Sequence, residues 1–358
     1  MNYKKEIMNK MKQIRQDFQV QEGSGLPEAR RQENFHSVMP LERRIPFRNY
    51  NNKTMKKILL AFILLMNLTA FAQQDALFSQ YMFNKLLVNP AYAGSREVFS
   101  VDLLNRYQWL GIEGAPRTIS LSAHTILKNK KVGLGGYVYR DELGPTIDQG
   151  FMATYSYRIR TQNGWFSFGI QGGLKYFDFD WNAINTQYPD QMFMPEDVRK
   201  ISPDANIGFY YQSPRFFAGI SSKQLLENEY GVVEVDGKTT FSRLARHFYG
   251  MAGWAIPIND RMTFRPSALA KYTKNAPAQV DLNASFIFNN VFWLGASFRT
   301  EKAVVFLTEF QIAKSIRLGY SFDLYLNELQ LHNRGSHEFR LGFDLPRKNE
   351  RMKTPRYF

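Results

Sequence analysis

The side chains of this sequence best suited to acid–base or nucleophilic chemistry are a few histidines and serines. His124 lies in the segment LSAHTIL, where Ser120 and Ser122 precede it at two-residue spacing, so all three side chains share one face of a strand. A histidine within hydrogen-bond reach can activate a serine hydroxyl as a nucleophile. Ser336 and His337 are adjacent instead, so on a strand they face opposite sides and cannot readily share a proton.

Neither arrangement has the sequence context of a hydrolase. No Gly-x-Ser-x-Gly motif and no metal-type His and Glu spacing occurs in the chain. The glycine-rich segment 132–139, VGLGGYVY, lacks the Lys-Ser/Thr that completes a phosphate-binding loop. The sequence therefore predicts no enzyme, no cofactor and no metal site, with a hydrolase that uses His124 as an alternative.

The segments that carry these residues alternate between apolar and polar side chains. In 278–288, Leu282 and Phe286 face one way, whereas Asp281 and Asn283 face the other. This period-two alternation is typical of strands with two unlike faces. Fourteen such segments follow one another, at 98–108, 117–127, 132–141, 147–160, 165–178, 204–212, 215–222, 246–257, 262–273, 278–288, 291–299, 303–312, 315–325 and 336–345.

Three features favour a transmembrane barrel over a soluble sandwich. Many segments are long enough to span a bilayer at a tilt, and their number is even, as in bacterial outer-membrane barrels. Aromatic residues make up 15% of the chain and gather near segment ends, as interfacial girdles do. Charged residues such as Arg265, Glu309 and Arg317 lie mid-strand on the polar face, which a barrel turns toward its lumen. The sequence predicts an all-β outer-membrane β-barrel of about 14 antiparallel strands over 98–345, followed by a tail, 346–358.

The segment 55–74, MKKILLAFILLMNLTAFAQQ, has the composition of a secretory signal peptide. Two lysines precede an apolar run that is too short to cross a bilayer, and a small-x-small pattern ends it. We expect a signal peptide at 55–72, cleaved between Ala72 and Gln73. Residues 1–54 are then a mis-assigned, disordered leader, and translation begins at Met55.

The charge of the chain is less extreme once these segments are removed. The formal net charge is +14, but residues 1–54 carry 11 Lys and Arg against 6 Asp and Glu, and the signal carries two lysines, which leaves +7. The remaining basic residues are scattered, so no nucleic-acid partner is expected. Cysteine is absent, which excludes disulfides and thiolate metal sites.

The mature N-terminus, 73–97, precedes the first predicted strand. Phe78, Tyr81 and Leu86 have rough helical spacing, and Asn89-Pro90 ends the element. We predict a short helical plug or periplasmic segment here that could close the pore. A simple cap on the first strand is the alternative.

Two polar connections, 181–204 and 223–246, are much longer than the others and lack barrel alternation. Long loops in compact folds are more often functional than idle, so we expect both to face outside and to contact a partner. Loop variation without a role is the alternative. Because interfaces favour aromatic and charged anchors, the predicted partner-binding residues are Tyr188, Asp190, Phe193, Asp197, Arg199, Tyr230 and Arg243.

Several blocks of the chain resemble the PorP/SprF family of Bacteroidota outer-membrane proteins. They cover most of the mature chain in order, and the most specific are Asn-Pro-Ala-Tyr-Ala-Gly at 89–94 and Gln-Trp-x-Gly-Ile-x-Gly-Ala-Pro at 108–116, beside the blocks 132–146, 188–193 and 243–250. The leader 1–54 departs from the family pattern.

The resemblance implies a role in the type IX secretion system and its gliding-motility branch. Its implied partners are outer-membrane lipid, a large secreted adhesin or its C-terminal sorting domain, and periplasmic components of the secretion system. A barrel of about 14 strands is too narrow for a folded domain, so the loops would hold the adhesin at the surface. The alternative is a diffusion channel or small-solute transporter whose lumen cations, Arg265, Lys271 and Arg317, favour anions.

Overall fold

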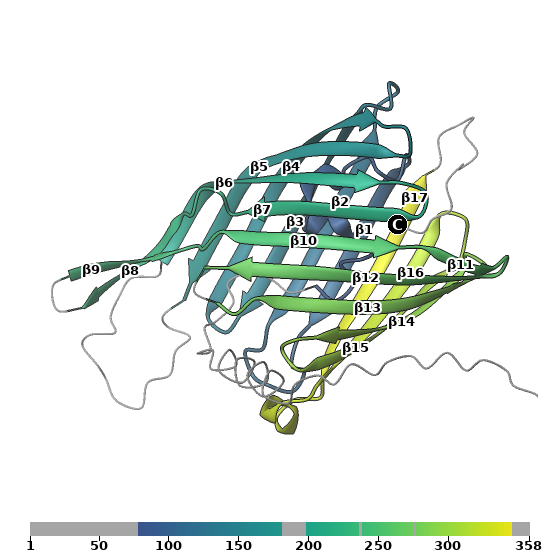
Figure 1. Ribbon diagram of the computed structural model, residues 1–358. Helices are drawn as coiled ribbons and strands as arrows, with labels where there is room; N and C mark the ends of the chain where they lie inside the picture. Colours follow the sequence, from purple (N-terminus) through teal and green to yellow (C-terminus); the bar gives the residue numbers. More distant parts are fainter. Residues whose placement is uncertain (1–77, 181–197, 236–237, 275, 346–358) are drawn as a thin grey trace, which may run out of the picture. The chain divides into compact units, whose positions relative to one another are not determined.

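Fourteen antiparallel strands close into a barrel in the computed structural model, which describes residues 78–180, 198–235, 238–274 and 276–345 (Figure 1). Consecutive strands pair along the chain, and the pairing of the first strand with the last completes the ring. The predicted barrel and its strand number are therefore confirmed. The barrel strands are β1 (Phe99–Tyr107), β2 (Arg117–Ile126), β3 (Val132–Leu143), β4 (Thr146–Arg160), β5 (Trp165–Phe179), β6 (Val198–Gln212), β7 (Phe216–Lys223), β10 (His247–Trp254), β12 (Met262–Thr273), β13 (Gln279–Phe288), β14 (Phe292–Arg299), β15 (Ala303–Gln311), β16 (Ile316–Tyr325) and β17 (Ser336–Leu345).

The two faces of the wall differ as the alternation predicts. Along β13, Asp281, Asn283 and Ser285 are buried against the lumen, whereas Leu282 and Phe286 are exposed on the outside. An apolar outer face suits lipid, and closure of the ring leaves no strand edge unpaired in the hydrocarbon. No helix in the described ranges is long and apolar enough to span a membrane.

The two ends of the barrel carry connections of different length. At one end, called here the turn end, the connections are short, for example 161–164 and 213–215. At the opposite end, called here the loop end, two connections run over 180–197 and 224–246. Strands alternate in direction, so both long connections lie at the same end, as the sequence predicted.

Both predicted long loops contain strand that the sequence analysis missed. β6 begins at Val198, within the first, and β8 (Glu229–Val235) pairs with β9 (Lys238–Arg243) in the second to form a separate hairpin. The sequence analysis predicted 223–246 as a long loop without barrel alternation and did not predict this hairpin. The register of the hairpin shifts between Tyr230 and Val232, which breaks the period-two pattern that identifies a strand. A short strand, β11 (Ile256–Asn259), extends beyond β10 and pairs with β12.

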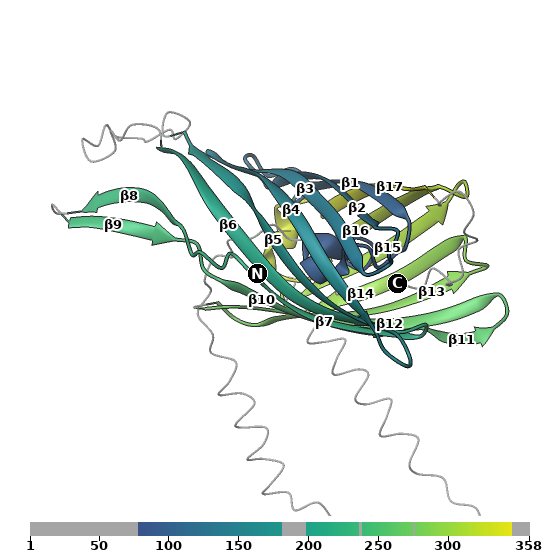
Figure 2. The same cartoon turned by 90° about the horizontal axis from the view of Figure 1, so that it is seen from above.

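Residues 78–97, called here the inner segment, lie inside the barrel. Two short 3₁₀ helices, η1 (Lys85–Leu87) and η2 (Pro90–Tyr92), form its centre, and a third, η4 (Glu328–Leu331), lies between β16 and β17. Figure 2 shows the blue turns of the inner segment surrounded by strands. Asn89 begins η2 by accepting a hydrogen bond from the Ala91 amide, and Pro90 supplies the fixed φ suited to a first helical position.

Candidate functional site

A buried ionic cluster holds the start of the inner segment. The Glu338 carboxylate on β17 accepts hydrogen bonds from the backbone amides of Ser79 and Gln80, each at 2.8 Å. Arg106 on β1 donates to Glu338 at 3.1 Å and to Asp323 on β16 at 2.7 Å. All of these groups are buried, so each charge is stabilised by its partners and not by water.

A second ionic cluster lies on the same side of the lumen. Arg340 on β17 donates to both Asp102 and Glu309, and Arg317 on β16 contacts Asp344 at 3.0 Å. The guanidinium of Arg340 also lies 5.4 Å from the ring of Phe83 in the inner segment. Each cation therefore joins several strands, or a strand and the inner segment.

Glycines on the opposite side of the wall receive the middle of the inner segment. A Cβ added to Gly208 on β6 would lie 2.2 Å from the Asn89 side-chain oxygen, and one added to Gly169 on β5 would lie 2.3 Å from the Ala91 nitrogen. Both distances are far inside van der Waals contact. Only residues without a side chain let η2 pack directly on the strand backbones here.

Asn89 uses this close approach to bond the wall itself. Its side-chain nitrogen donates to the carbonyl oxygens of Phe209 on β6 at 2.9 Å and of Ile220 on β7 at 3.2 Å. These two residues are register partners, so the amide spans the junction of two strands. Nearby, Lys85 is buried, with its ammonium donating to the Met82 carbonyl and lying 4.8 Å from the Phe217 ring.

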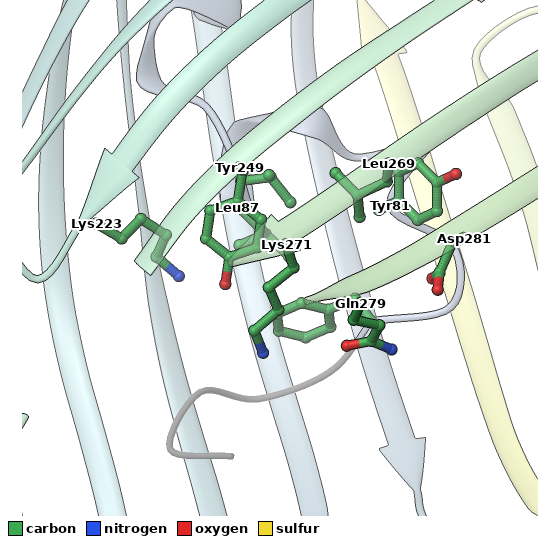
Figure 3. Close-up of a pocket in the computed structure, with 10 residues that line it drawn as sticks. Tyr81, Leu87, Lys223, Tyr249, Leu269, Lys271, Gln279 and Asp281 are labelled. Carbon is green, nitrogen blue, oxygen red and sulfur yellow. The ribbon is translucent and has the colours of Figure 1, made fainter. Parts of the chain in front are cut away.

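Two cavities beside the inner segment are small. One cavity, drawn in Figure 3, lies between Tyr81, Leu87 and the lysines Lys223 and Lys271 of the wall, and its volume is about 30 Å³. A second, beside Tyr139, is also about 30 Å³. Each is enough for one or two water molecules. Among the described residues, these cavities offer no room for a solute at the level of the inner segment.

The predicted partner-binding residues are only partly described. Tyr188, Asp190, Phe193 and Asp197 lie outside the described residues, as do the predicted cleavage site, Ala72 and Gln73, and the leader. Tyr230 is in β8. Arg199 on β6 and Arg243 on β9 are exposed and contact Asp178 and Glu229 at 3.6 and 2.5 Å, respectively.

The loop-end part of β6 is bonded to the second long connection. Lys200 on β6 donates to the Glu229 carbonyl at 2.5 Å, and Asn228 donates to the Pro203 carbonyl at 2.6 Å. The structure therefore brings the Arg199 and Arg243 regions together at the loop end, although they are far apart in sequence.

His124 is hydrogen-bonded to the inner segment. Its ring nitrogen Nδ1 accepts a hydrogen bond from the Gly94 amide at 3.2 Å, and Ser122 accepts one from Asn84 at 2.8 Å. The adjacent residues Ser336 and His337 face opposite sides of β17, as expected. Ser336 faces the lumen, and His337 is hydrogen-bonded to Tyr320 on the outside. In the described ranges, no group of three or more His, Asp or Glu residues could hold a metal ion.

The ionic contacts that hold the inner segment were not predicted from the sequence. Charged residues such as Arg317, Asp323 and Glu338 occupy polar positions of the alternating segments, but no contact with the inner segment was predicted for them or for Arg106. Their inward register was visible as charge at polar positions of alternating strands. Their partners were not visible, because strands that meet in the barrel are remote in sequence.

The family assignment comes from a comparison with protein-family models. A model described as "Type IX secretion system membrane protein PorP/SprF" matches residues 70–343. The chain belongs to the PorP/SprF family. The PorP/SprF match includes the inner segment and reaches into the last barrel strand, so both parts of the site fall within the region common to the family.

Other comparisons add only distant likenesses to this PorP/SprF chain. No curated protein sequence matches. The toluene transporter TbuX of Ralstonia pickettii is 8% identical, with 72% of this chain and 92% of that chain covered and a TM-score of 0.45. The monoaromatic hydrocarbon channel CymD is 11% identical, with 77% of this chain and 95% of that chain covered and a TM-score of 0.44. Omp33 of Acinetobacter baumannii is 8% identical, with 70% of this chain and 100% of that chain covered and a TM-score of 0.41.

Proposed function

We propose that this type IX secretion membrane protein is a closed barrel that holds a large secreted adhesin at the cell surface through its loop end. The observation that carries the proposal is the fixed inner segment, which is bonded to strands on both sides of the lumen. A barrel closed in this way offers no route for cargo. Its contribution to secretion is then a binding surface, and the cargo passes through another component.

We further propose that the inner segment is the plug of this barrel. Ser79 and Gln80 bond charged residues of β1, β16 and β17, and Asn89 bonds β6 and β7. A strand cap would contact one side of the barrel only. Export through the predicted signal peptide at 55–72 would deliver the chain to the outer membrane, with residues 73–97 entering the lumen.

The proposed adhesin-binding surface lies on the loop end. The described part of this surface contains two exposed cations, Arg199 on β6 and Arg243 on β9, near the contact between β6 and the second long connection. Arginines that are exposed on a surface suit recognition of a partner's carboxylates, because the guanidinium can bind a carboxylate with two hydrogen bonds. The partner is therefore proposed to be the C-terminal sorting domain of the adhesin, with periplasmic secretion components meeting the turn end.

The test is co-purification from outer membranes in mild detergent, followed by mass spectrometry. The full chain is compared with an Arg199→Gln, Arg243→Gln double variant and with Arg215→Gln, an exposed turn-end arginine, as the matched control. The proposal predicts that one very large surface protein is recovered with the wild type and the control but not with the double variant.

Other outcomes would overturn parts of the proposal. Equal recovery with all three chains would exclude the loop-end arginines as the binding surface. Recovery of periplasmic secretion components alone would place the chain in the general secretion machinery. A chain that is recovered alone and conducts ions in a planar bilayer would be a diffusion channel, since a plugged barrel should conduct none.

A further inference from the structure

The outer surface of the barrel carries an apolar groove of about 480 Å³. It runs over β6, β7, β10 and β12, which lie side by side at the front of Figure 1. Its edges are large side chains that are exposed on the outside, among them Ile220, Phe248 and Tyr272. Phe248 and Tyr272 are register partners and stack with ring centroids 6.3 Å apart.

The groove exists because two paired outward positions carry almost no side chain. Gly250 on β10 lies opposite Ala270 on β12. Leu282 on β13 and Phe306 on β15 fill comparable outward positions elsewhere on the wall. A Cβ added to Gly250 would meet no atom within 4 Å, so no described residue fills the space. In a membrane it must be filled by another molecule, because an unfilled void loses the contacts of the atoms that line it.

Two cations lie just beyond the loop end of the groove, outside its lining. Arg246 and Lys274 directly flank His247 and Thr273, the last register pair of β10 and β12. Both are accessible, and Arg246 also contacts Glu227 at 3.7 Å and donates to the Leu225 carbonyl. The long connections identify the loop end as the outside, as in other outer-membrane barrels. The cations therefore lie level with the headgroups of the outer leaflet.

We propose that this groove binds one acyl chain of a phosphorylated lipid of the outer leaflet, with the lipid phosphate against Arg246 and Lys274. Lipid tails are as apolar as the groove, so the groove itself selects only by shape. Preference for one lipid must come from the cations, because basic residues near a membrane surface attract anionic headgroups at about 1 kcal/mol each. The acyl chain would occupy the space that larger side chains would fill at Gly250 and Ala270.

The test is native mass spectrometry of the full chain purified in mild detergent and mixed with bisphosphorylated lipid A. The same lipid A after enzymatic removal of its phosphates measures the headgroup contribution. Gly250→Leu fills the groove. Gly172→Leu is the matched control, because Gly172 is also an exposed glycine with free space for a Cβ, on β5 outside the groove. Altered migration of unheated samples on gels confirms that each variant forms a barrel.

We expect wild type and Gly172→Leu to retain one phosphorylated lipid A and Gly250→Leu to retain at least tenfold less. Lys274→Gln should lower the preference for the phosphorylated form about fivefold, which corresponds to the loss of one headgroup cation. Equal retention by Gly250→Leu and Gly172→Leu would overturn the proposal. So would equal retention of the two lipid forms by the wild type. Loss of a co-purifying protein from Gly250→Leu, with lipid retention unchanged, would assign the groove to a protein partner instead and likewise overturn it.

Discussion

The inner segment is held in two different ways along its length. Near its start, Ser79 and Gln80 meet buried carboxylates that are neutralised by arginines of the barrel. Further along, Asn89 and Ala91 pack against glycine backbones of β5 and β6. The contacts of Ser79 and Gln80 require every charged partner to be present. The contacts of Asn89 and Ala91 require that the facing strand residues have no side chain. One short segment thus combines attachment by charge with attachment by shape.

The difference has energetic consequences. A buried charge that loses its partner remains without water and without compensation, which is strongly destabilising. A side chain added to a tight contact can be relieved by a local shift of the segment, at lower cost. We therefore expect the ionic contacts to contribute most to the stability of the barrel. The contacts with Gly169 and Gly208 should mainly determine where the inner segment lies.

Glu338→Ala should have the largest effect on the free energy of unfolding. It removes the acceptor of the Ser79 and Gln80 amides and leaves Arg106 with a missing buried partner. Breaking a buried pair from one side costs about 3–5 kcal/mol. Urea unfolding of the barrel in lipid vesicles, followed by tryptophan fluorescence, measures the loss. A change below about 1 kcal/mol would mean that the ionic cluster does not hold the inner segment.

Gly208→Val should displace the inner segment while leaving the barrel folded. The new side chain would collide with Asn89, which already lies within 2.2 Å of an added Cβ. Overpacking of this kind costs about 1–3 kcal/mol. The readout is ion conductance in a planar bilayer, absent in the wild type and present in the variant. Gly172→Val, with free space around its Cβ, is the control and should stay closed.

Asn89→Ala should have a smaller effect on the same side of the lumen. The substitution removes two hydrogen bonds to the junction of β6 and β7, and one to the Ala91 amide. Only the Ala91 amide is left without a partner, because the two freed carbonyls belong to paired strands, so the cost is about 1 kcal/mol, the low end for an unsatisfied buried group. Hydrogen exchange should become faster in residues 88–93 and stay unchanged in β13. Equal protection of residues 88–93 in the wild type and in Asn89→Ala would show that the Asn89 side chain does not hold the inner segment.

The strands could be predicted from the sequence because their signal is local. Alternation such as that in 278–288 depends only on which face of one strand meets lipid, so all fourteen barrel strands were located within a few residues, apart from the early start of β6. The β8–β9 hairpin was missed because it is not part of the wall and its register is broken.

The contacts of the inner segment could not be predicted in the same way. Arg106 and Glu338 are 232 residues apart, and they meet because the first and last strands close the ring. No local pattern encodes such a pairing. The glycines at 169 and 208 likewise look like ordinary strand glycines until the segment that packs on them is placed.

The smallest effect on stability is expected for Arg243→Gln, which breaks an ion pair with the same chemistry as the Arg106 and Glu338 pair. Arg243 contacts Glu229 at 2.5 Å, but its side chain is 69% exposed, whereas that of Arg106 is 1% exposed. Water replaces the lost partner at an exposed site, so such pairs contribute at most about 1 kcal/mol. The unfolding midpoint in urea should therefore match the wild type within error. A loss as large as that of Glu338→Ala would show that burial does not decide the strength of these pairs. An unchanged midpoint would also allow any loss of a co-purifying partner from this variant to be attributed to binding, because the barrel itself would be intact.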